Sequence, residues 1–195
     1  MNHTPHSQFS AEERATLLEI AARSIEHGLE QGSPLPVATI DFPAELLETR
    51  ACFVTLLLGG DLRGCIGHLE AHLPIVEDVA ENAYAAAFRD PRFPPLSSHE
   101  RENLEIHISV LSPAEAINFE SEQELVSKIR PSVDGLILLD GHHRGTFLPS
   151  VWESIPDTRN FLSHLKQKAG LPANYWSNTL EVYRYETESF SDAPS

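Results

Sequence analysis

The sequence has little cysteine, few basic residues and no long apolar segment. Only 2 of its 195 residues are cysteine, which is too few for a disulfide scaffold or for a structural zinc site built from thiolates. Its 14 basic and 29 acidic side chains give a net charge of −15, and such a surface repels phosphate backbones, so we expect no nucleic-acid binding. No apolar run approaches the roughly 18 residues that span a bilayer, and the N-terminus lacks the basic and apolar regions of a signal peptide. We therefore expect a cytoplasmic protein that does not enter a membrane.

The remaining composition is typical of a folded globular domain, with 41% apolar and 22% charged residues. Helices are predicted where a capping residue precedes apolar residues spaced three and four apart, and strands where β-formers cluster or apolar and polar residues alternate. The flanking segments 1–9 and 188–195 are polar and are expected to be flexible tails around a single domain of residues 10–187. The expected helices cover residues 10–28 or 10–32, 74–88, 121–129 and 157–170, and the expected strands cover residues 51–58, 62–66, 104–110, 135–139, 145–148 and 179–185.

These elements form a weak internal repeat. Residues 51–111 and 135–187 each contain a hairpin, a helix and a strand, which predicts an α+β fold of two similar strand–helix repeats with mainly antiparallel sheets flanked by helices. The return strand of each hairpin carries Arg-Gly and then a residue capable of nucleophilic attack: Cys65 in the first repeat and Thr146 in the second. Two such hairpins would place both segments at one cleft; alternatively, Arg-Gly is simply frequent after tight turns.

Cys65 is the most unusual candidate for chemistry. Arg63 lies two residues before it and is expected on the same strand face, where a cation favours the nucleophilic thiolate. Gly64 and Gly67 on either side would allow a ligand or another backbone to approach closely. The alternative is that Cys65 is a small buried apolar residue beside a bulge. Cys52, in the opposite strand, is expected to pack in the core.

Histidines and a proline-braced loop supply further candidates. His107 alternates with Glu105 and Ser109 on the polar face of a strand and is a candidate general base; alternatively it is a partly exposed sheet residue. Asp90 and Arg92 are held in a stiff loop between prolines, where they would line a site or simply pair with each other. His68 with His72 and His142 with His143 lack a spacing specific to metal ligands, so no metal is predicted, although none of the four is excluded as a ligand.

Several of these segments resemble a known family. They are LRGCIG at 62–67, FRDPRFPPL at 88–96, ISVLS at 108–112, and GLIL, RGTFLP and VWE between 135 and 153. In this order they are similar to the blocks of the AMMECR-type family, also called AmmeMemoRadiSam system protein A. The resemblance implies an α+β fold of two repeats and a setting with Memo-like and radical-SAM proteins as partners, but it implies no reaction and no cofactor. His68 departs from the small polar residue expected after the first block, so its role would be specific to this chain.

Two functions remain open. In the first, Cys65 is the nucleophile or carrier thiol of an enzyme or enzyme component that acts on a small substrate, with Arg63 as the activating cation and His107 moving protons. The resemblance makes Arg144 and Thr146 the next candidates. In the second, the chain is a non-catalytic ligand- or protein-binding module, which uses the loops around Arg63, Arg92 and Arg144.

Overall fold

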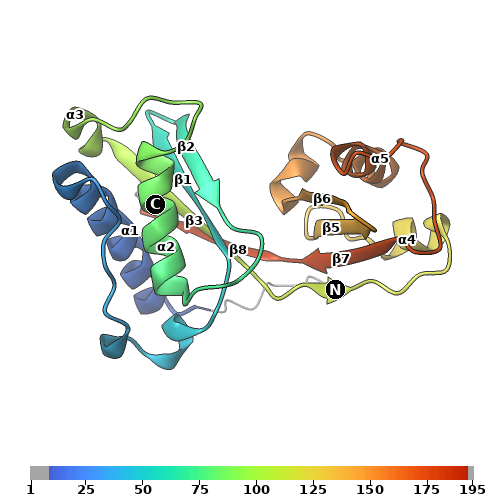
Figure 1. Ribbon diagram of the computed structural model, residues 1–195, viewed down its shortest axis with the longest axis horizontal. Helices are drawn as coiled ribbons and strands as arrows, with labels where there is room; N and C mark the ends of the chain where they lie inside the picture. Colours follow the sequence, from blue (N-terminus) through green and yellow to red (C-terminus); the bar gives the residue numbers. More distant parts are fainter. Residues whose placement is uncertain (1–8, 193–195) are drawn as a thin grey trace. The chain divides into compact units, whose positions relative to one another are not determined.

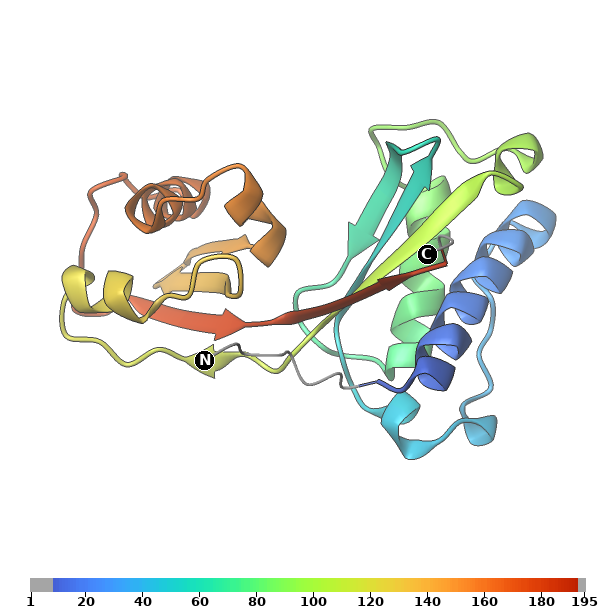
Figure 2. The ribbon, with the colours of Figure 1, turned by 180° about the vertical axis from the view of Figure 1, so that it is seen from behind.

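The computed structural model describes residues 9–192, which divide into two compact units. Unit 1 contains the described chain up to Leu111 together with the residues from Glu188 onward, and unit 2 contains Ser112–Thr187. The chain therefore enters unit 2 once and returns once, as Figure 1 and Figure 2 show from opposite sides. Among the described residues, no helix is long and apolar enough to cross a membrane.

Unit 1 is built on a four-stranded antiparallel sheet with strand order β2-β1-β3-β8. Helices α1 and α2 lie on the same face of this sheet, which we call the inner face, and the opposite face is the outer face (Figures 1 and 2). The main elements are α1 (Ala11–Gln31), β1 (Cys52–Leu58), β2 (Asp61–Gly67), α2 (Ile75–Phe88), α3 (Ser98–Arg101), β3 (Leu104–Leu111) and β8 (Thr187–Ser191).

Local sequence explains where these elements begin and end. The Ser10 side chain accepts from the Glu13 amide while the Glu13 carboxylate accepts from the Ser10 amide, so the expected capping box opens α1. Gly32 ends α1 in the left-handed conformation, with φ of 70°. Alternation along β1 and β3 places every second apolar side chain on the inner face against both helices. Those inner residues include Cys52, Val54, Leu56, Ile106, Ile108 and Val110.

Unit 2 contains a second four-stranded antiparallel sheet, with strand order β4-β7-β5-β6. The Asp157 carboxylate caps α5 by accepting from the Asn160 amide, and Phe161, Leu162 and Leu165 of α5 are buried in the core of this unit. The elements are β4 (Glu115–Ala116), α4 (Glu122–Lys128), β5 (Gly135–Asp140), β6 (His143–Phe147), α5 (Thr158–Lys168) and β7 (Glu181–Tyr185).

The two units share one plan, which confirms the predicted α+β fold of two repeats. Each has an antiparallel hairpin, then a helix, then a strand beside the first hairpin strand: β1-β2-α2-β3 in unit 1 and β5-β6-α5-β7 in unit 2. In both units the glycine of Arg-Gly packs against the backbone of the helix that follows the hairpin. A Cβ on Gly64 would lie 2.1 Å from the Ala86 carbonyl oxygen of α2, and a Cβ on Gly145 would lie 2.9 Å from the Leu165 carbonyl oxygen of α5. Glycine therefore lets the helix backbone pack directly on the return strand.

The structure differs from the expected secondary structure mainly at the chain's end. Residues 187–191 form strand β8 beside β3, where a flexible tail was expected, and Glu188 forms an ion pair of 2.6 Å with Arg14. The segment is held because its backbone completes the edge of the sheet and Phe190, its one apolar side chain, packs against the core of unit 1. The expected tail residues 1–8 and 193–195 lie outside the described residues, and Phe9 is buried.

Candidate functional site

The outer face of the sheet in unit 1 brings Cys65 and His107 into one row. Thr55 of β1 is paired with Cys65 on β2 and with His107 on β3, so the three side chains lie side by side across neighbouring strands. All three are partly exposed. We call them the Cys65 row. Strand spacing of about 4.8 Å places Cys65 and His107 roughly 10 Å apart, so Thr55, and not His107, contacts the thiol.

The Cys65 thiol has two polar neighbours. Its Sγ lies 3.2 Å from the Thr55 hydroxyl. Its own amide faces away from β1 and donates to the Asp90 carboxylate at 2.9 Å, because β2 is the edge of the sheet. Cys52 is different in every respect: it lies on the inner face, is fully buried, and burial raises the pKa of its thiol well above the usual range. The two thiols point to opposite faces and do not form a redox pair.

The loop after α2 closes the open edge of β2. Asp90 is almost fully buried and accepts hydrogen bonds from Nε and Nη2 of Arg92, at 2.9 and 2.7 Å, as well as from the Cys65 amide. The Arg92 hydrogen bonds hold the pKa of Asp90 well below its usual range. In return Asp90 raises the pKa of Arg92, and the neighbouring Cys65 adds to this effect. Nη2 of Arg92 also donates to the Cys65 carbonyl at 3.4 Å, and about half of the Arg92 side chain is exposed.

Arg63 does not lie beside Cys65 as expected. The pairing of β1 with β2 shifts between Leu56 and Leu57, which makes Arg63 the additional residue of a β-bulge. Its guanidinium instead forms an ion pair of 2.7 Å with Glu100 and donates to the Pro94 carbonyl at 3.0 Å. The hydrogen bonds that Glu100 accepts from Arg63, together with those from Ser97, lower the pKa of Glu100 to about 2. Arg63 thus fastens the loop and α3 to the sheet.

His107 has a carboxylate neighbour on its own strand. Its Nε2 lies 3.6 Å from the Glu105 carboxylate, and both side chains are partly exposed. Beyond them on the outer face, the hydroxyls of Ser109 and Ser189 lie 2.8 Å apart. The Cys65 row therefore continues into further polar groups that can donate and accept protons.

The space beside Gly64 and Gly67 of the LRGCIG segment is filled by neighbouring atoms of the protein. The space over Gly64 is filled by the α2 backbone, and a Cβ on Gly67 would lie 2.4 Å from the Phe53 ring and 2.5 Å from the Cys52 carbonyl oxygen. Neither glycine leaves room for a ligand on the side where its Cβ would stand.

The matching residues of unit 2 have different surroundings. Thr146 pairs with Ile137, which also pairs with Tyr183, so the row equivalent to the Cys65 row contains no thiol and no histidine. Thr146 is 6% exposed, and within the described part of the chain its hydroxyl has no hydrogen-bond partner. Arg144 is exposed. That the two Arg-Gly segments face one cleft stays a prediction.

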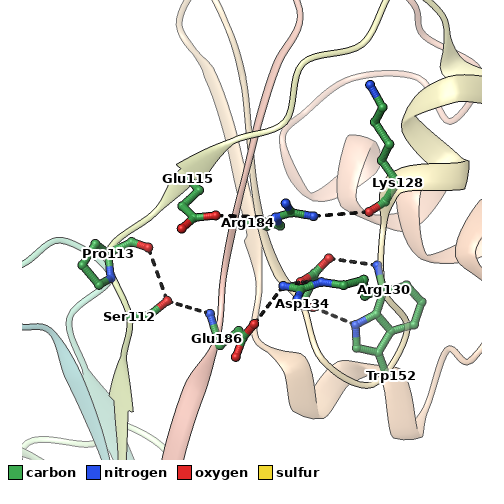
Figure 3. A network of polar contacts seen from close by, with 9 residues as sticks. All are labelled: Ser112, Pro113, Glu115, Lys128, Arg130, Asp134, Trp152, Arg184 and Glu186. Carbon is green, nitrogen blue, oxygen red and sulfur yellow. Dashed lines mark hydrogen bonds and ion pairs between the residues drawn. The ribbon is translucent and has the colours of Figure 1, made fainter. Parts of the chain in front are cut away.

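A polar network in unit 2, which the sequence did not suggest, joins the two segments that connect the units. The fully buried Asp134 pairs with Arg130, whose guanidinium also contacts the Glu186 carboxylate at 2.9 Å, as Figure 3 shows. The Ser112 amide donates to the Glu186 carbonyl at 2.8 Å, and the Glu186 amide donates to the Ser112 hydroxyl at 2.9 Å. The outgoing and returning chains are thereby tied to each other within unit 2.

The family comparison agrees with the residues just described. A model of the AMMECR1 family matches residues 18–190, which include the Cys65 row, the loop of Asp90 and Arg92, and both Arg-Gly segments. The chain belongs to the AMMECR1 family. Members of similar length come from archaea and bacteria, and their names assign no activity.

Two relatives and one solved structure illustrate the similarity. A protein of Methanothermobacter thermautotrophicus is 37% identical over 96% of this chain and 98% of its own length. A protein of Thermotoga maritima is 36% identical over 87% of this chain and 94% of its own. The crystal structure of the uncharacterized protein PH0010 from Pyrococcus horikoshii has a TM-score of 0.83 and 35% identity, over 95% of this chain and 94% of that one. The likeness to PH0010 therefore covers both repeats of the fold.

Proposed function

We propose that this AMMECR1-family chain is an enzyme, or a component of one, that uses Cys65 as a nucleophile or carrier thiol in group transfer on a small substrate. The observation that carries the proposal is the difference between its two cysteines. Cys52 is fully buried in the core, beside Asn82 and Asp78, whereas Cys65 is partly exposed on the outer face, beside a hydroxyl and an arginine. Accessible cysteines near a cation are the ones that react.

The neighbours of Cys65 have separate tasks in this proposal. Arg92 supplies the positive charge that favours the thiolate, and the Thr55 hydroxyl donates a hydrogen bond to the sulfur. The thiolate attacks an electrophilic carbon of the substrate, and the leaving group departs with the bonding electron pair. His107, with Glu105, is too far from the sulfur to take its proton, but it lies on the same face and is placed to protonate or deprotonate a bound substrate.

The proposed partners follow from the family resemblance. Memo-like and radical-SAM proteins would supply or receive the transferred group, and Cys65 would hold it between them. The cofactor requirement of such a system would then reside in the radical-SAM partner.

A second function is a non-catalytic module that binds a ligand or a partner protein. The favouring observation is that Arg92 is fixed by the buried Asp90 while about half of its side chain stays exposed. A guanidinium held in this way presents its remaining donors to a carboxylate or phosphate. In this case Cys65→Ser would keep binding to a purified Memo-like protein, and Arg92→Ala would weaken it.

Alkylation by iodoacetamide tests the first function. We expect the native protein to gain one adduct rapidly, at Cys65, in both the wild type and Cys52→Ala, and the Cys52 thiol to react only after unfolding in urea. Arg92→Gln should slow the reaction at pH 7 several-fold, because in this proposal it removes the positive charge that favours the thiolate. Arg63→Gln is the matched control and should leave the rate nearly unchanged, since the Arg63 guanidinium is held by Glu100 and the Pro94 carbonyl, whereas Arg92 contacts Cys65.

The opposite results would refute the proposal. If Cys65 in the folded protein reacts as slowly as Cys52, it is a structural residue. If Arg63→Gln slows the reaction and Arg92→Gln does not, the cation that stabilises the thiolate is Arg63 and not Arg92. Intact-mass measurement with peptide mapping distinguishes these cases.

A further inference from the structure

A second polar cluster lies at the end of β2, away from the Cys65 row. His68 follows the last residue of β2, His72 lies in the loop that leads to α2, and Asp78 lies in the first turn of α2. The ligand atoms of these three residues all lie within 4.8 Å of one another. The His68 amide donates to the Cys52 carbonyl at 3.0 Å, which fixes the start of the loop to β1.

Asp78 is an unusual carboxylate because it is fully buried without a basic partner. Its Oδ2 accepts from the Cys52 amide at 2.9 Å and from the Asn82 side chain at 3.0 Å, while its Oδ1 lies 2.5 Å from Nδ1 of His68. No lysine or arginine in the described chain forms an ion pair with it. Buried carboxylates are paired with a charge or coordinate a metal, and at Asp78 only His68, or an ion held with it, can provide that charge.

His72 is oriented as a metal-bound histidine usually is. Nδ1 of His72 lies 3.1 Å from the Glu70 carbonyl oxygen, so it carries the proton, and the lone pair of Nε2 is left for a ligand. The ring of His68 meets that of His72 edge-on, with the centroids 4.4 Å apart. Metal-bound histidines are commonly fixed in this way by a carbonyl or carboxylate on the other ring nitrogen.

We propose that His68, His72 and Asp78 bind one divalent transition-metal ion of the zinc class. In a tetrahedral zinc site, ligand distances of about 2.0–2.2 Å place the ligand atoms roughly 3.3 Å apart, which small side-chain movements achieve from the present geometry. Two imidazoles and one carboxylate suit Zn²⁺, whereas Mg²⁺ and Ca²⁺ prefer oxygen ligands alone. His72 is exposed, so the fourth position faces solvent and is open to water or to a ligand. The site does not depend on the function proposed for Cys65.

Direct titration tests the site. Protein without an affinity tag and treated with a chelator is titrated with ZnCl₂ by calorimetry, and with Co²⁺ to record the visible absorption of a tetrahedral ion. We expect one saturable site per chain that a large excess of Mg²⁺ does not displace. His72→Ala should lower the Zn²⁺ affinity at least about tenfold and remove the Co²⁺ bands, and this exposed side chain is not needed for folding.

The chain provides a matched control in its other close histidine pair. The rings of His142 and His143 have centroids 4.1 Å apart, as close as those of His68 and His72. Asp140 is paired with His143 across the strands, but within the described residues these three do not form a cluster with metal-ligand spacing. The double variant His142→Ala/His143→Ala should bind Zn²⁺ as the wild type does. Absence of one-to-one binding, unchanged affinity in both His72→Ala and His68→Ala, or loss of binding in the double variant would each overturn the proposal.

Discussion

Replacing Gly64 by alanine tests whether the glycine of the LRGCIG segment serves packing. A Cβ at this position would lie 2.1 Å from the Ala86 carbonyl oxygen and 3.0 Å from its carbonyl carbon. Ordinary contacts are about 3.5 Å or longer, so the α2 backbone or β2 must move by more than about 1 Å. Gly64 does not have a positive φ, so its backbone conformation suits alanine and the close contact alone makes the substitution unfavourable.

The expected loss of stability is at the upper end of the range for overpacked sites, about 3 kcal/mol, because the obstacle is helix backbone and no side chain can rotate away. Gly145→Ala meets the Leu165 carbonyl oxygen at 2.9 Å and should cost less, about 1 to 2 kcal/mol. Gly60→Ala is the control in the same hairpin: it meets nothing within 4 Å and is opposed only by its φ of 85°, at about 1 kcal/mol.

Urea denaturation followed by circular dichroism measures the free energy of unfolding of each variant. The reasoning requires the order Gly64→Ala, then Gly145→Ala, then Gly60→Ala, from most to least destabilised. If Gly64→Ala is as stable as Gly60→Ala, the helix does not press on β2, and the glycine would have to be explained by something that binds there.

Two further predictions concern the loop that closes β2. Asp90→Asn should destabilise the fold by about 2 kcal/mol, measured in urea, and speed alkylation of Cys65, because it removes the charged acceptor of Arg92 and of the Cys65 amide. Asp61 is exposed, so Asp61→Asn should change neither stability nor the alkylation rate. Equal effects of the two substitutions would contradict the role of Asp90. Because the pKa of Glu100 is lowered from 4.5 to about 2, its contribution to stability is present above pH 4.5 and is lost as the pH falls toward 2. The stability difference between wild type and Glu100→Gln should therefore shrink over that pH range, and a constant difference would argue against the pairing with Arg63.

Local patterns were sufficient to predict most of the fold. Capping residues and apolar spacing located the four longer helices, and the repeat of Arg-Gly after each hairpin indicated two similar units. Strand β8 was missed because its sequence, TESFS, has only one apolar residue, and a strand at the edge of a sheet is held by backbone hydrogen bonds that leave no apolar pattern.

The candidate site was predictable only in part, because face assignments depend on an unbroken strand period. Cys65 and His107 lie on one face, as alternation along each strand allows. Arg63 fails the same rule, since it is the additional residue of a β-bulge, which interrupts the alternation of side chains along β2. The cluster of His68, His72 and Asp78 was not predicted either. Its three members come from the end of a strand, a loop and a helix, which only the folded chain brings together.

In the Arg-Gly motif the glycine serves the fold in both repeats, whereas the surroundings of the residue after it differ between them. Gly64 and Gly145 both lie against helix backbone, so the glycine accounts for the fold of either unit. The residue after each glycine belongs to a row of paired residues across its sheet: Cys65, Thr55 and His107 in unit 1, and Thr146, Ile137 and Tyr183 in unit 2.

Of the two rows, the first alone combines a thiol, a hydroxyl and an imidazole, and there the buried Asp90 accepts from the Cys65 amide and from Arg92. In unit 2 the threonine is buried and its neighbour Ile137 is apolar. If the fold requires both repeats but only one carries out chemistry, the glycine–helix packing should be the same in both units while the rows of paired side chains differ. Thr146→Val should therefore leave both Cys65 alkylation and partner binding unchanged, because it replaces a buried hydroxyl that has no hydrogen-bond partner in the described structure. A loss of either in that variant would assign unit 2 a direct part in the function.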